Sequence, residues 1–265
     1  MPIRQFKSIV LVALALLVGL ISSAQAAQSI TIATNPPYRP MEYTTPSGQL
    51  KGFDIELGNA MCKQAGLECE WTPQSWNGII PGLMAHKYDA IMSSMTINKR
   101  RKKHVLFSNP YIVVPSAFYI PKSSSLQEIG KKSLKGKNIG VQRGTVQDDY
   151  VTAEYDDIAT IKRYKNASGV TTDMSTGRVD VAFFDEITGH ASLIEKHPGK
   201  YKQIGPKLTK PKKYFGSGFG IAFRKGEKAL AKKVNKALAT LKENGTYAEI
   251  HKKYFGNSSD KGYSE

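Results

Sequence analysis

The sequence predicts an α/β protein built from two similar lobes. Strand-like and helix-like segments alternate along the chain, an order typical of parallel sheets covered by helices. The alternation begins again after about residue 116, and a faint internal repeat relates residues 83–90 to residues 174–181. In each copy a helix ends, the chain turns at a basic residue or a glycine, and a buried strand follows an aspartate. The repeat indicates either two lobes of one design or the general likeness of helix-to-strand turns.

The first half of the chain contains three predicted strands and two predicted helices. Strands are expected at residues 29–34, 68–72 and 89–95. One helix follows Gly52 and ends near Ala65, and the next is expected at residues 77–86. Three prolines after the first strand hold the chain in an extended loop, at positions 36, 37 and 40.

The second half continues the alternation. Strands are expected at residues 116–120, 138–141, 161–164, 179–184 and 218–223. Helices are expected after Thr145, near residues 169–176, at residues 227–243, and up to about Tyr254. Apolar residues at helical spacing support the longest of these helices, at Leu230, Val234, Leu238 and Leu241.

The first 26 residues predict a secretory signal peptide. Arg4 and Lys7 make a basic start, and residues 9–21 carry no charge. A cleavage site of the A-x-A kind ends at Ala26. The 13 residues of the uncharged run are too few to span a bilayer. We therefore expect a mature chain of residues 27–265 that is exported.

The charge of the chain is strongly positive, with 38 Lys and Arg residues against 22 Asp and Glu residues. Without Arg4 and Lys7 the excess is 36 minus 22, or +14. Such an excess can indicate nucleic-acid binding. The lysines are scattered, however, no zinc-finger or RNA-binding motif accompanies them, and an exported protein rarely meets nucleic acid. We expect no nucleic-acid partner; a solvated surface or attraction to anionic envelope surfaces explains the charge better.

Sequence signals for catalysis are poor. The chain contains no G-x-S-x-G elbow, no H-E-x-x-H, no P-loop and no G-x-G-x-x-G after a strand. The five histidines lie singly, without metal-ligand spacing, and are expected at the surface. We predict no catalytic residue, no metal and no cofactor. Cys62 and Cys69 join a helix end to the next strand, and in an oxidising compartment they are expected to form a disulfide.

Four polar loops follow predicted strands, at the sheet edge where α/β proteins bind ligands. They contain residues 35–38, residues 93–96 with Arg101 close behind, residues 143–145, and Asp185. A guanidinium binds a carboxylate through two hydrogen bonds, and helix N-termini add backbone N–H donors. An aspartate with hydroxyl and carbonyl acceptors holds an ammonium. Together the loops predict a site for a zwitterion.

Each of these residues also has an interpretation without a ligand. Arg101 belongs to a basic run that is usually solvated, and Asp185 suits a helix N-cap. Thr96 suits a turn hydroxyl. Tyr38 and Trp76 suit core aromatics.

Short motifs are spread along the whole mature chain. They are residues 37–40 (PYRP), 52–57 (GFDIEL), the Cys62/Cys69 spacing, residues 89–97 (DAIMSSMTI) with Arg100 and Arg101, residues 107–108 (FS), 140–141 (GV), 184–186 (FDE), 213–216 (KYFG) and 244–247 (NGTY). Each motif alone is weak evidence. In this order, they resemble the periplasmic binding proteins for polar amino acids, and most closely those for lysine/arginine/ornithine and for histidine.

The resemblance implies a type II periplasmic-binding-protein fold, in which two α/β lobes are joined by two strand-like hinge crossovers and close on a ligand cleft between them. Lobe 1 would hold residues 27–112 and 219–265, lobe 2 residues 117–209, and the crossovers residues 113–116 and 210–218. The resemblance also implies a monomer that captures a free L-amino acid and delivers it to a membrane ABC permease complex.

The resemblance further implies how the ligand zwitterion is held. Arg101 pairs with the α-carboxylate, helped by the backbone N–H groups of Thr96 and Thr145. Asp185, the Thr96 hydroxyl and the Ser94 carbonyl take the α-ammonium.

The ligand side chain is expected between Tyr38 and Trp76. Two flat aromatics suit a guanidinium or another cation, which favours arginine, with lysine, ornithine and histidine as further ligands. Ser93 and Gln147 also line the cleft. Asn35 stands where relatives with basic ligands carry an acidic residue.

Departures from the family pattern keep other functions open. Asn35 accepts a weaker hydrogen bond than a carboxylate, and Glu42 or Asp54 would compensate for it. The lobe-2 loop also departs, at Gln142, Arg143 and Val146. An inward-pointing Arg143 would repel a cation, so glutamine, citrulline or an opine are alternative ligands. An exported dehydratase on the same fold, with Glu186 or Glu42 as general acid, is the enzymatic alternative, and a surface adhesin is a third.

Overall fold

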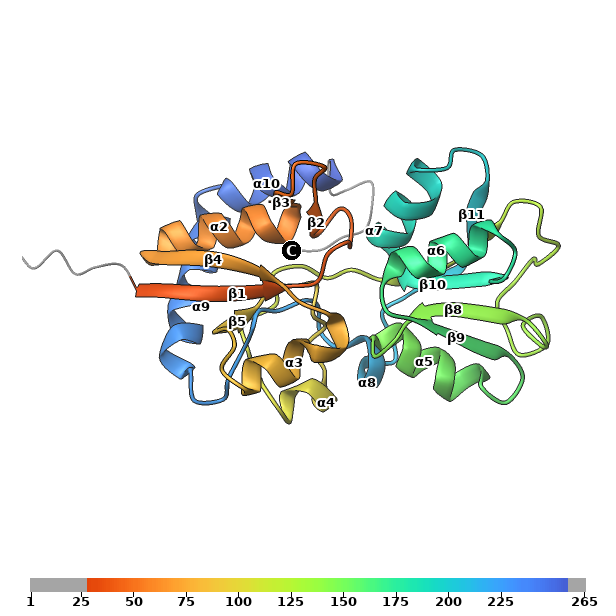
Figure 1. The fold of residues 1–265 in the computed structure, drawn as a ribbon, viewed down its shortest axis with the longest axis horizontal. Helices are drawn as coiled ribbons and strands as arrows, with labels where there is room; N and C mark the ends of the chain where they lie inside the picture. The colour runs from red at the N-terminus through yellow and green to blue at the C-terminus, as the bar shows by residue number, and fades with distance from the viewer. Residues whose placement is uncertain (1–27, 257–265) are drawn as a thin grey trace, which may run out of the picture.

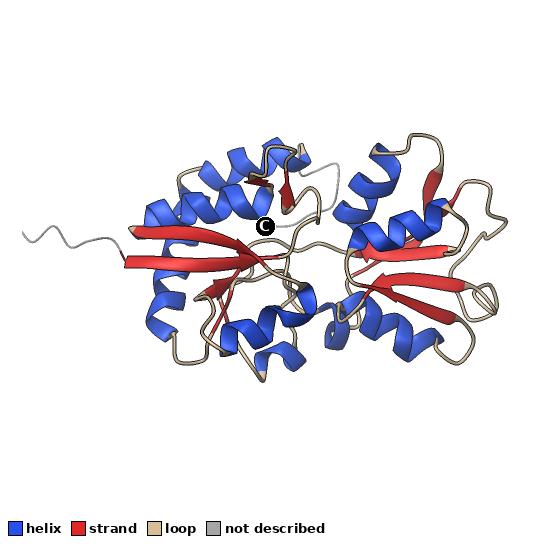
Figure 2. Ribbon diagram, in the orientation of Figure 1, coloured by secondary structure: helices blue, strands red, loops and turns tan. Residues whose placement is uncertain are grey.

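The computed structural model describes residues 28–256, so the predicted signal peptide lies outside the described residues. Two β-sheets lie side by side and form two lobes (Figure 1). Helices cover both faces of each sheet (Figure 2). The predicted α/β class with two lobes is confirmed.

The first lobe takes its chain from both ends of the described sequence. Its elements are β1 (Gln28–Thr34), β2 (Tyr43–Thr44), β3 (Leu50–Lys51), α2 (Phe53–Ala65), β4 (Leu67–Pro73), α3 (Trp76–Met84), β5 (Ala90–Ile91), α4 (Lys99–Lys102), β6 (Leu106–Phe107), β12 (Ala222–Phe223), α9 (Lys228–Glu243) and α10 (Thr246–Phe255). The main sheet has the order β4-β1-β5-β12-β6, and β2 and β3 form a separate ribbon.

The second lobe is made from one continuous stretch of chain. Its elements are β7 (Ser116–Pro121), β8 (Asn138–Gln142), α5 (Val146–Tyr155), β9 (Thr160–Tyr164), α6 (Ala167–Ser175), β10 (Val181–Asp185), α7 (Glu186–Gly189), the π-helical turn η1 (His190–Glu195) and β11 (Tyr201–Leu208). The sheet has the order β11-β7-β10-β8-β9.

The chain passes between the two sheets twice, once between β6 and β7 and once between β11 and β12. The second passage contains α8 (Lys212–Phe215), so it is not strand-like throughout. The Phe215 ring of α8 lies 5.1 Å from the Tyr150 ring of α5, which packs this passage against the second lobe. The exact limits of the lobes and of the hinge crossovers stay a prediction.

Both sheets are mixed, whereas the sequence predicts parallel ones. β1 is parallel to β4 and β5, and β8 is parallel to β9 and β10. β12 runs antiparallel to β5 and β6, and β7 runs antiparallel to β10 and β11. Both β7 and β12 begin after the chain has crossed from the other lobe, at the edge where the parallel strands end. A strand that starts at that edge must run in the opposite direction.

Two predicted strands are much shorter than expected. The predicted strand at residues 89–95 contains only β5, because Ser94 turns the chain with a φ of 49°. The predicted strand at residues 218–223 contains only β12, although Phe219 makes isolated bridges to Thr96 and Ile112. The residues thus removed from the first of these strands include Ser93 and Ser94, which line the cavity described below.

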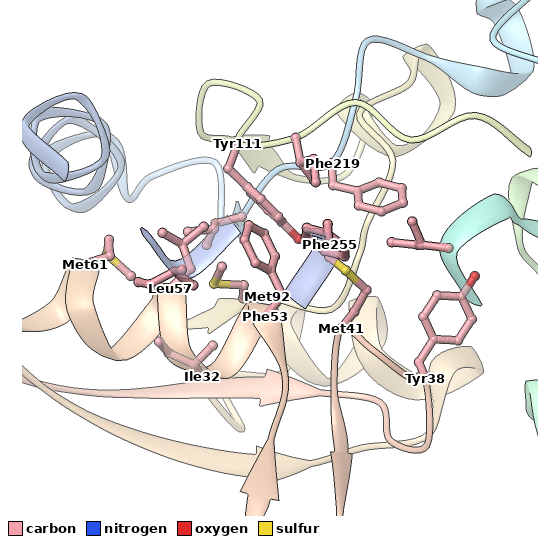
Figure 3. Close-up of a cluster of buried hydrophobic side chains, with 14 of the residues drawn as sticks. Ile32, Tyr38, Met41, Phe53, Leu57, Met61, Met92, Tyr111, Phe219 and Phe255 are labelled. Carbon is pink, nitrogen blue, oxygen red and sulfur yellow. The ribbon is translucent and has the colours of Figure 1, made fainter. Parts of the chain in front are cut away.

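The core of the first lobe includes a group of aromatic side chains around Phe53, which pack among methionine and aliphatic side chains (Figure 3). The Phe53 ring centroid lies 4.9 Å from that of Phe255 and 6.1 Å, edge-on, from that of Tyr247. Edge-on and tilted pairs at these distances are favourable beyond the area that they bury. His251 is buried in the same cluster, with its ring 6.1 Å from that of Phe53, so the expected surface position is wrong for this histidine.

Cys62 of α2 and Cys69 of β4 form the predicted disulfide, with Cα atoms 6.1 Å apart. The two residues are seven positions apart, so the bond closes a short loop. We expect the double substitution Cys62→Ser, Cys69→Ser to lower the free energy of unfolding by about 2–3 kcal/mol, by the loss of this cross-link in the unfolded chain. Denaturant unfolding of both proteins measures the difference, and no difference at all would contradict the prediction.

Candidate ligand-binding site

A cavity lies between the two lobes. All ten residues predicted from the sequence line it, together with three more. The lining residues are Asn35, Tyr38, Glu42, Trp76, Ser93, Ser94, Thr96, Arg101, Gln142, Thr145, Val146, Gln147 and Asp185.

The cavity lies at the carboxyl ends of the parallel strands. Asn35 follows β1, and its backbone N–H donates to Ser93 Oγ in the loop after β5, at 3.0 Å. Gln142 and Asp185 are the last residues of β8 and β10 in the other lobe. The two sheets therefore present their ligand-binding edges to each other.

Arg101 is the buried cation of the site, with 4% of its surface exposed. Asn98 caps α4 by accepting from Arg101 N at 2.9 Å, and Arg101 Nη1 donates to Thr96 O at 3.0 Å. Burial and the charge of Arg100 lower the pKa of the Arg101 guanidinium to about 10, so it stays protonated at neutral pH. Among the described residues no carboxylate forms an ion pair with it.

Asp185 is the buried acid on the opposite wall. It precedes α7 but makes no capping hydrogen bond, so the N-cap interpretation does not describe its side chain. Its carboxylate accepts from Tyr38 Oη at 2.5 Å and from Gln147 Nε2 at 2.7 Å. Burial raises the pKa of Asp185 to about 6, although the hydrogen bonds from Tyr38 and Gln147 oppose the shift.

Two aromatic side chains line the cavity on the first lobe. Tyr38 lies at the edge of the Phe53 cluster, with its hydroxyl group directed away from Phe53 (Figure 3). Trp76 begins α3, and its ring centroid is 5.0 Å from the guanidinium carbon of Arg101. Its Nε1 donates to Gly144 O of the second lobe at 3.1 Å. Both aromatics pack against core clusters and also line the cavity, so they fit both interpretations.

Asn35 and Gln142 form a polar contact across the cavity. Gln142 Nε2 donates to Asn35 Oδ1 at 3.0 Å, and Asn35 Nδ2 donates to Gln74 O at 2.6 Å. Arg143 is exposed and is not among the lining residues, so it does not bring a repelling charge into the cavity.

Three lining residues are not among those predicted: Glu42, Gln142 and Val146. The place of Gln142 at the end of β8 was a usable signal, since ligand residues follow such strands. Glu42 enters the cavity through a tight turn in which Tyr38 N donates to Glu42 O at 2.6 Å. The prolines mark this loop in the sequence, and Glu42 is expected there only as a substitute for Asn35, but no residue pattern shows that the turn buries Glu42.

Direct contacts hold the lobes together beside the cavity. Tyr38, Trp76 and Gln142 each donate a hydrogen bond to the other lobe, as described above. Outside the cavity, Arg100 of α4 pairs with Asp149 of α5 through two contacts, at 2.7 and 3.0 Å. The structure is therefore that of the closed cleft.

Two further properties bear on the chemistry of residues 28–256. No group of three or more His, Cys, Asp or Glu side chains in this part of the chain is placed to hold a metal ion. None of its helices is long and apolar enough to cross a membrane.

The model of the bacterial extracellular solute-binding proteins, family 3, matches residues 30–257. An L-arginine-binding protein of Pseudomonas aeruginosa is 40% identical over 245 residues, which are 92% of this chain and 94% of that protein. The lysine/arginine/ornithine-binding periplasmic protein of Escherichia coli K12 is 35% identical over 250 residues, 92% of this chain and 96% of that protein. The resemblance found in the sequence is confirmed.

Solved structures show the same likeness. An ancestral arginine-binding protein bound to arginine matches with a TM-score of 0.80 and 33% identity, over 88% of this chain and 100% of that one.

Proposed function

The chain belongs to the bacterial extracellular solute-binding proteins of family 3, and from this premise we propose that it captures a basic L-amino acid, arginine-like first, in the periplasm. It delivers the ligand to an ABC permease by hinge closure. Lysine, ornithine and histidine are further members of the ligand class. The observation that carries the proposal is a buried arginine and a buried aspartate that face one cavity from opposite lobes.

Arg101 binds the ligand α-carboxylate, because its guanidinium is buried, charged and without a carboxylate partner among the described residues. Thr96 and Thr145 contribute backbone N–H groups. Asp185, the Thr96 hydroxyl and the Ser94 carbonyl hold the α-ammonium. Because Arg101 and Asp185 belong to different lobes, only the closed cleft satisfies both ends of the zwitterion, and ligand binding stabilises closure.

The side chain of the ligand lies between Tyr38 and Trp76, whose rings favour a cation. Glu42 lines the same cavity and supplies the acidic partner that Asn35 lacks. A carboxylate binds a guanidinium more strongly than an amide oxygen does. Glutamine, citrulline and an opine are the alternative ligands, since Asn35 and Gln142 offer amide partners to a neutral side chain.

The protein works as a monomer without catalytic turnover and without a nucleic-acid partner. The hinge lies near residues 113–116 and 210–218, between lobe 1 (residues 27–112 and 219–265) and lobe 2 (residues 117–209). A dehydratase on this fold needs a general acid in the cleft. Glu186 does not line the cavity and pairs with Lys207 at 3.2 Å, which leaves Glu42 as the acid for that alternative.

The experiment is calorimetric titration of the mature protein after unfolding and refolding to remove bound ligand. The panel contains arginine, lysine, ornithine, histidine, citrulline, glutamine, glutamate and octopine. We expect arginine to bind most tightly. A neutral or acidic amino acid in first place would overturn the basic ligand class but keep amino-acid capture, and turnover of a prephenate-like acid would favour the enzyme.

A further inference from the structure

Two buried carboxylates lie close together at the ligand cavity, which Glu42 lines and Asp54 does not. Glu42 is 1% exposed and Asp54 is 0% exposed. Ser94 Oγ lies 3.3 Å from Glu42 Oε2 and 3.5 Å from Asp54 Oδ2, so a single hydroxyl group stands between the two acids. Since a hydroxyl donates one proton, it can satisfy only one of them at a time.

The local fold enforces this proximity. Gly52 has a φ of 131°, and a Cβ there would lie 2.1 Å from Met41 O. With glycine, the start of α2 packs directly on the preceding turn, where Asp54 N donates to Met41 O at 2.9 Å. The backbone therefore places Asp54 against the residue that follows Met41, which is Glu42.

The carboxylates of Glu42 and Asp54 accept few hydrogen bonds, and all of the donors are uncharged groups. Glu42 accepts from Ser93 Oγ at 2.7 Å. Asp54 Oδ2 accepts from Ser94 N at 2.7 Å and from Tyr111 Oη at 3.0 Å. Asp54 Oδ1 is buried and has no hydrogen-bond partner among the described residues.

No cation of the described residues forms an ion pair with either acid. The charged and titratable groups that face them are Tyr111 beside Asp54, and Tyr38, Asp185 and Arg101 around the cavity. Burial raises the pKa of Glu42 well above its ordinary value, and the charge of Asp54 raises it further. Burial also raises the pKa of Asp54, to about 7. Two ionised carboxylates are unfavourable at this site.

We propose that Glu42 and Asp54 share one proton while the cavity is empty, and that a cationic ligand side chain displaces this proton into solvent. The proposal rests on the proposed function, because it takes the ligand side chain to lie beside Glu42. The ligand cation takes over the role of the proton in neutralising the pair. Arginine binding therefore releases a proton that the binding of a neutral ligand does not release.

Citrulline is the matched ligand, because it has the shape of arginine without the charge. Both ligands place an ammonium beside Asp185, so any proton that Asp185 loses is common to both. The difference in released protons between arginine and citrulline isolates the pair of Glu42 and Asp54.

The experiment is titration of the refolded protein with both ligands at pH 7 in buffers of different ionisation enthalpy, which yields the number of protons released. We expect arginine to release between about half a proton and one proton more than citrulline. Glu42→Gln abolishes the difference, and Asp54→Asn lowers it by removing the neighbouring charge. Glu249→Gln, on the exposed side of α10, leaves it unchanged.

A failure of this inference and a failure of the proposed function give different results. If arginine binds tightly and releases no more protons than citrulline, this inference is wrong and the proposed function stands. If arginine does not bind, the proposed function and the inference are both wrong. If citrulline binds too weakly to titrate, the pH dependence of the arginine Kd in the wild type and in Glu42→Gln gives the same difference, since one released proton changes Kd by about tenfold per pH unit.

Discussion

Replacing Arg101 with alanine is expected to weaken arginine binding by more than about 3 kcal/mol, which raises Kd by more than about 100-fold. The ligand carboxylate would still lose its water in the closed cleft, but no charge would replace that water. The guanidinium is buried, and its Nη1 is fixed by Thr96 O at 3.0 Å, so it is already oriented before a ligand arrives. Calorimetric titration of the refolded variant with arginine measures the loss.

Arg100→Ala is the matched control, because it removes the same charge one residue away. The Arg100 side chain is 54% exposed and pairs with Asp149 at 2.7 Å. Exposed pairs of this kind contribute at most about 1 kcal/mol, so a change of about fivefold or less is expected. A loss of less than tenfold for Arg101→Ala would remove this residue from the carboxylate site. Equal losses for both variants would mean that overall charge, and not the position of the guanidinium, determines affinity.

The positions of many cavity-lining residues could be predicted because the ends of strands are visible in the sequence. The apolar run of β10 ends at Asp185, and the serines after β5 follow a buried strand in the same way. In parallel strands, such residues meet at one edge. The family motifs then relate that edge to a zwitterion.

Strand direction could not be predicted from the same signals. β7 and β12 read as ordinary apolar strands, but each starts where the chain arrives from the other lobe, and each therefore runs antiparallel to a neighbour. Two-residue strands such as β6 are too short for an alternating pattern to be visible. The direction of these strands depends on how the chain connects the lobes, and residue periodicity does not show that connection.

The role of Glu42 is the clearest case of tertiary control. A glutamate after a proline-rich turn predicts a solvated surface as well as a buried acid. Its burial depends on the contact between the turn and α2, which Gly52 permits. Because Asp54 arrives through that same contact, the sequence contains both acids but gives no sign that they meet.

Replacing Asp185 with asparagine is expected to weaken binding about as severely, by more than about 100-fold, because the ligand ammonium then loses the only buried carboxylate on the second-lobe wall of the described cavity. Asparagine keeps the size of the side chain, so packing against Tyr38 and Gln147 is retained. Asp156→Asn, on the exposed end of α5, is the control for charge alone and should bind as the wild type does. Unchanged affinity in Asp185→Asn would remove Asp185 from the site.

The pH dependence of ligand affinity distinguishes the effect of the charge of Asp185 from the effect of its shape. Burial raises the pKa of Asp185 to about 6, and the ligand ammonium needs the ionised form. Citrulline affinity should therefore be constant above about pH 7, fall about fivefold from pH 6 to pH 5, and fall about tenfold for each further unit. Asp185→Asn should remove this dependence while it lowers affinity at every pH.

In the ligand-free protein, the raised pKa of Asp185 makes folding stability depend on pH in the opposite direction, so that stability falls as the pH rises. The folded protein holds the Asp185 proton more tightly than the unfolded chain, whose carboxyl group has the ordinary pKa of 3.8. The contribution of this group to stability is therefore present at about pH 4 and is lost as the pH rises through about 6. The stability difference between wild type and Asp185→Asn, measured by denaturant unfolding across this range, should shift against the wild type as pH rises. A flat difference would mean that Asp185 is ionised in the empty cleft at its ordinary pKa, and a citrulline affinity that still fell below pH 6 would then have to come from another group.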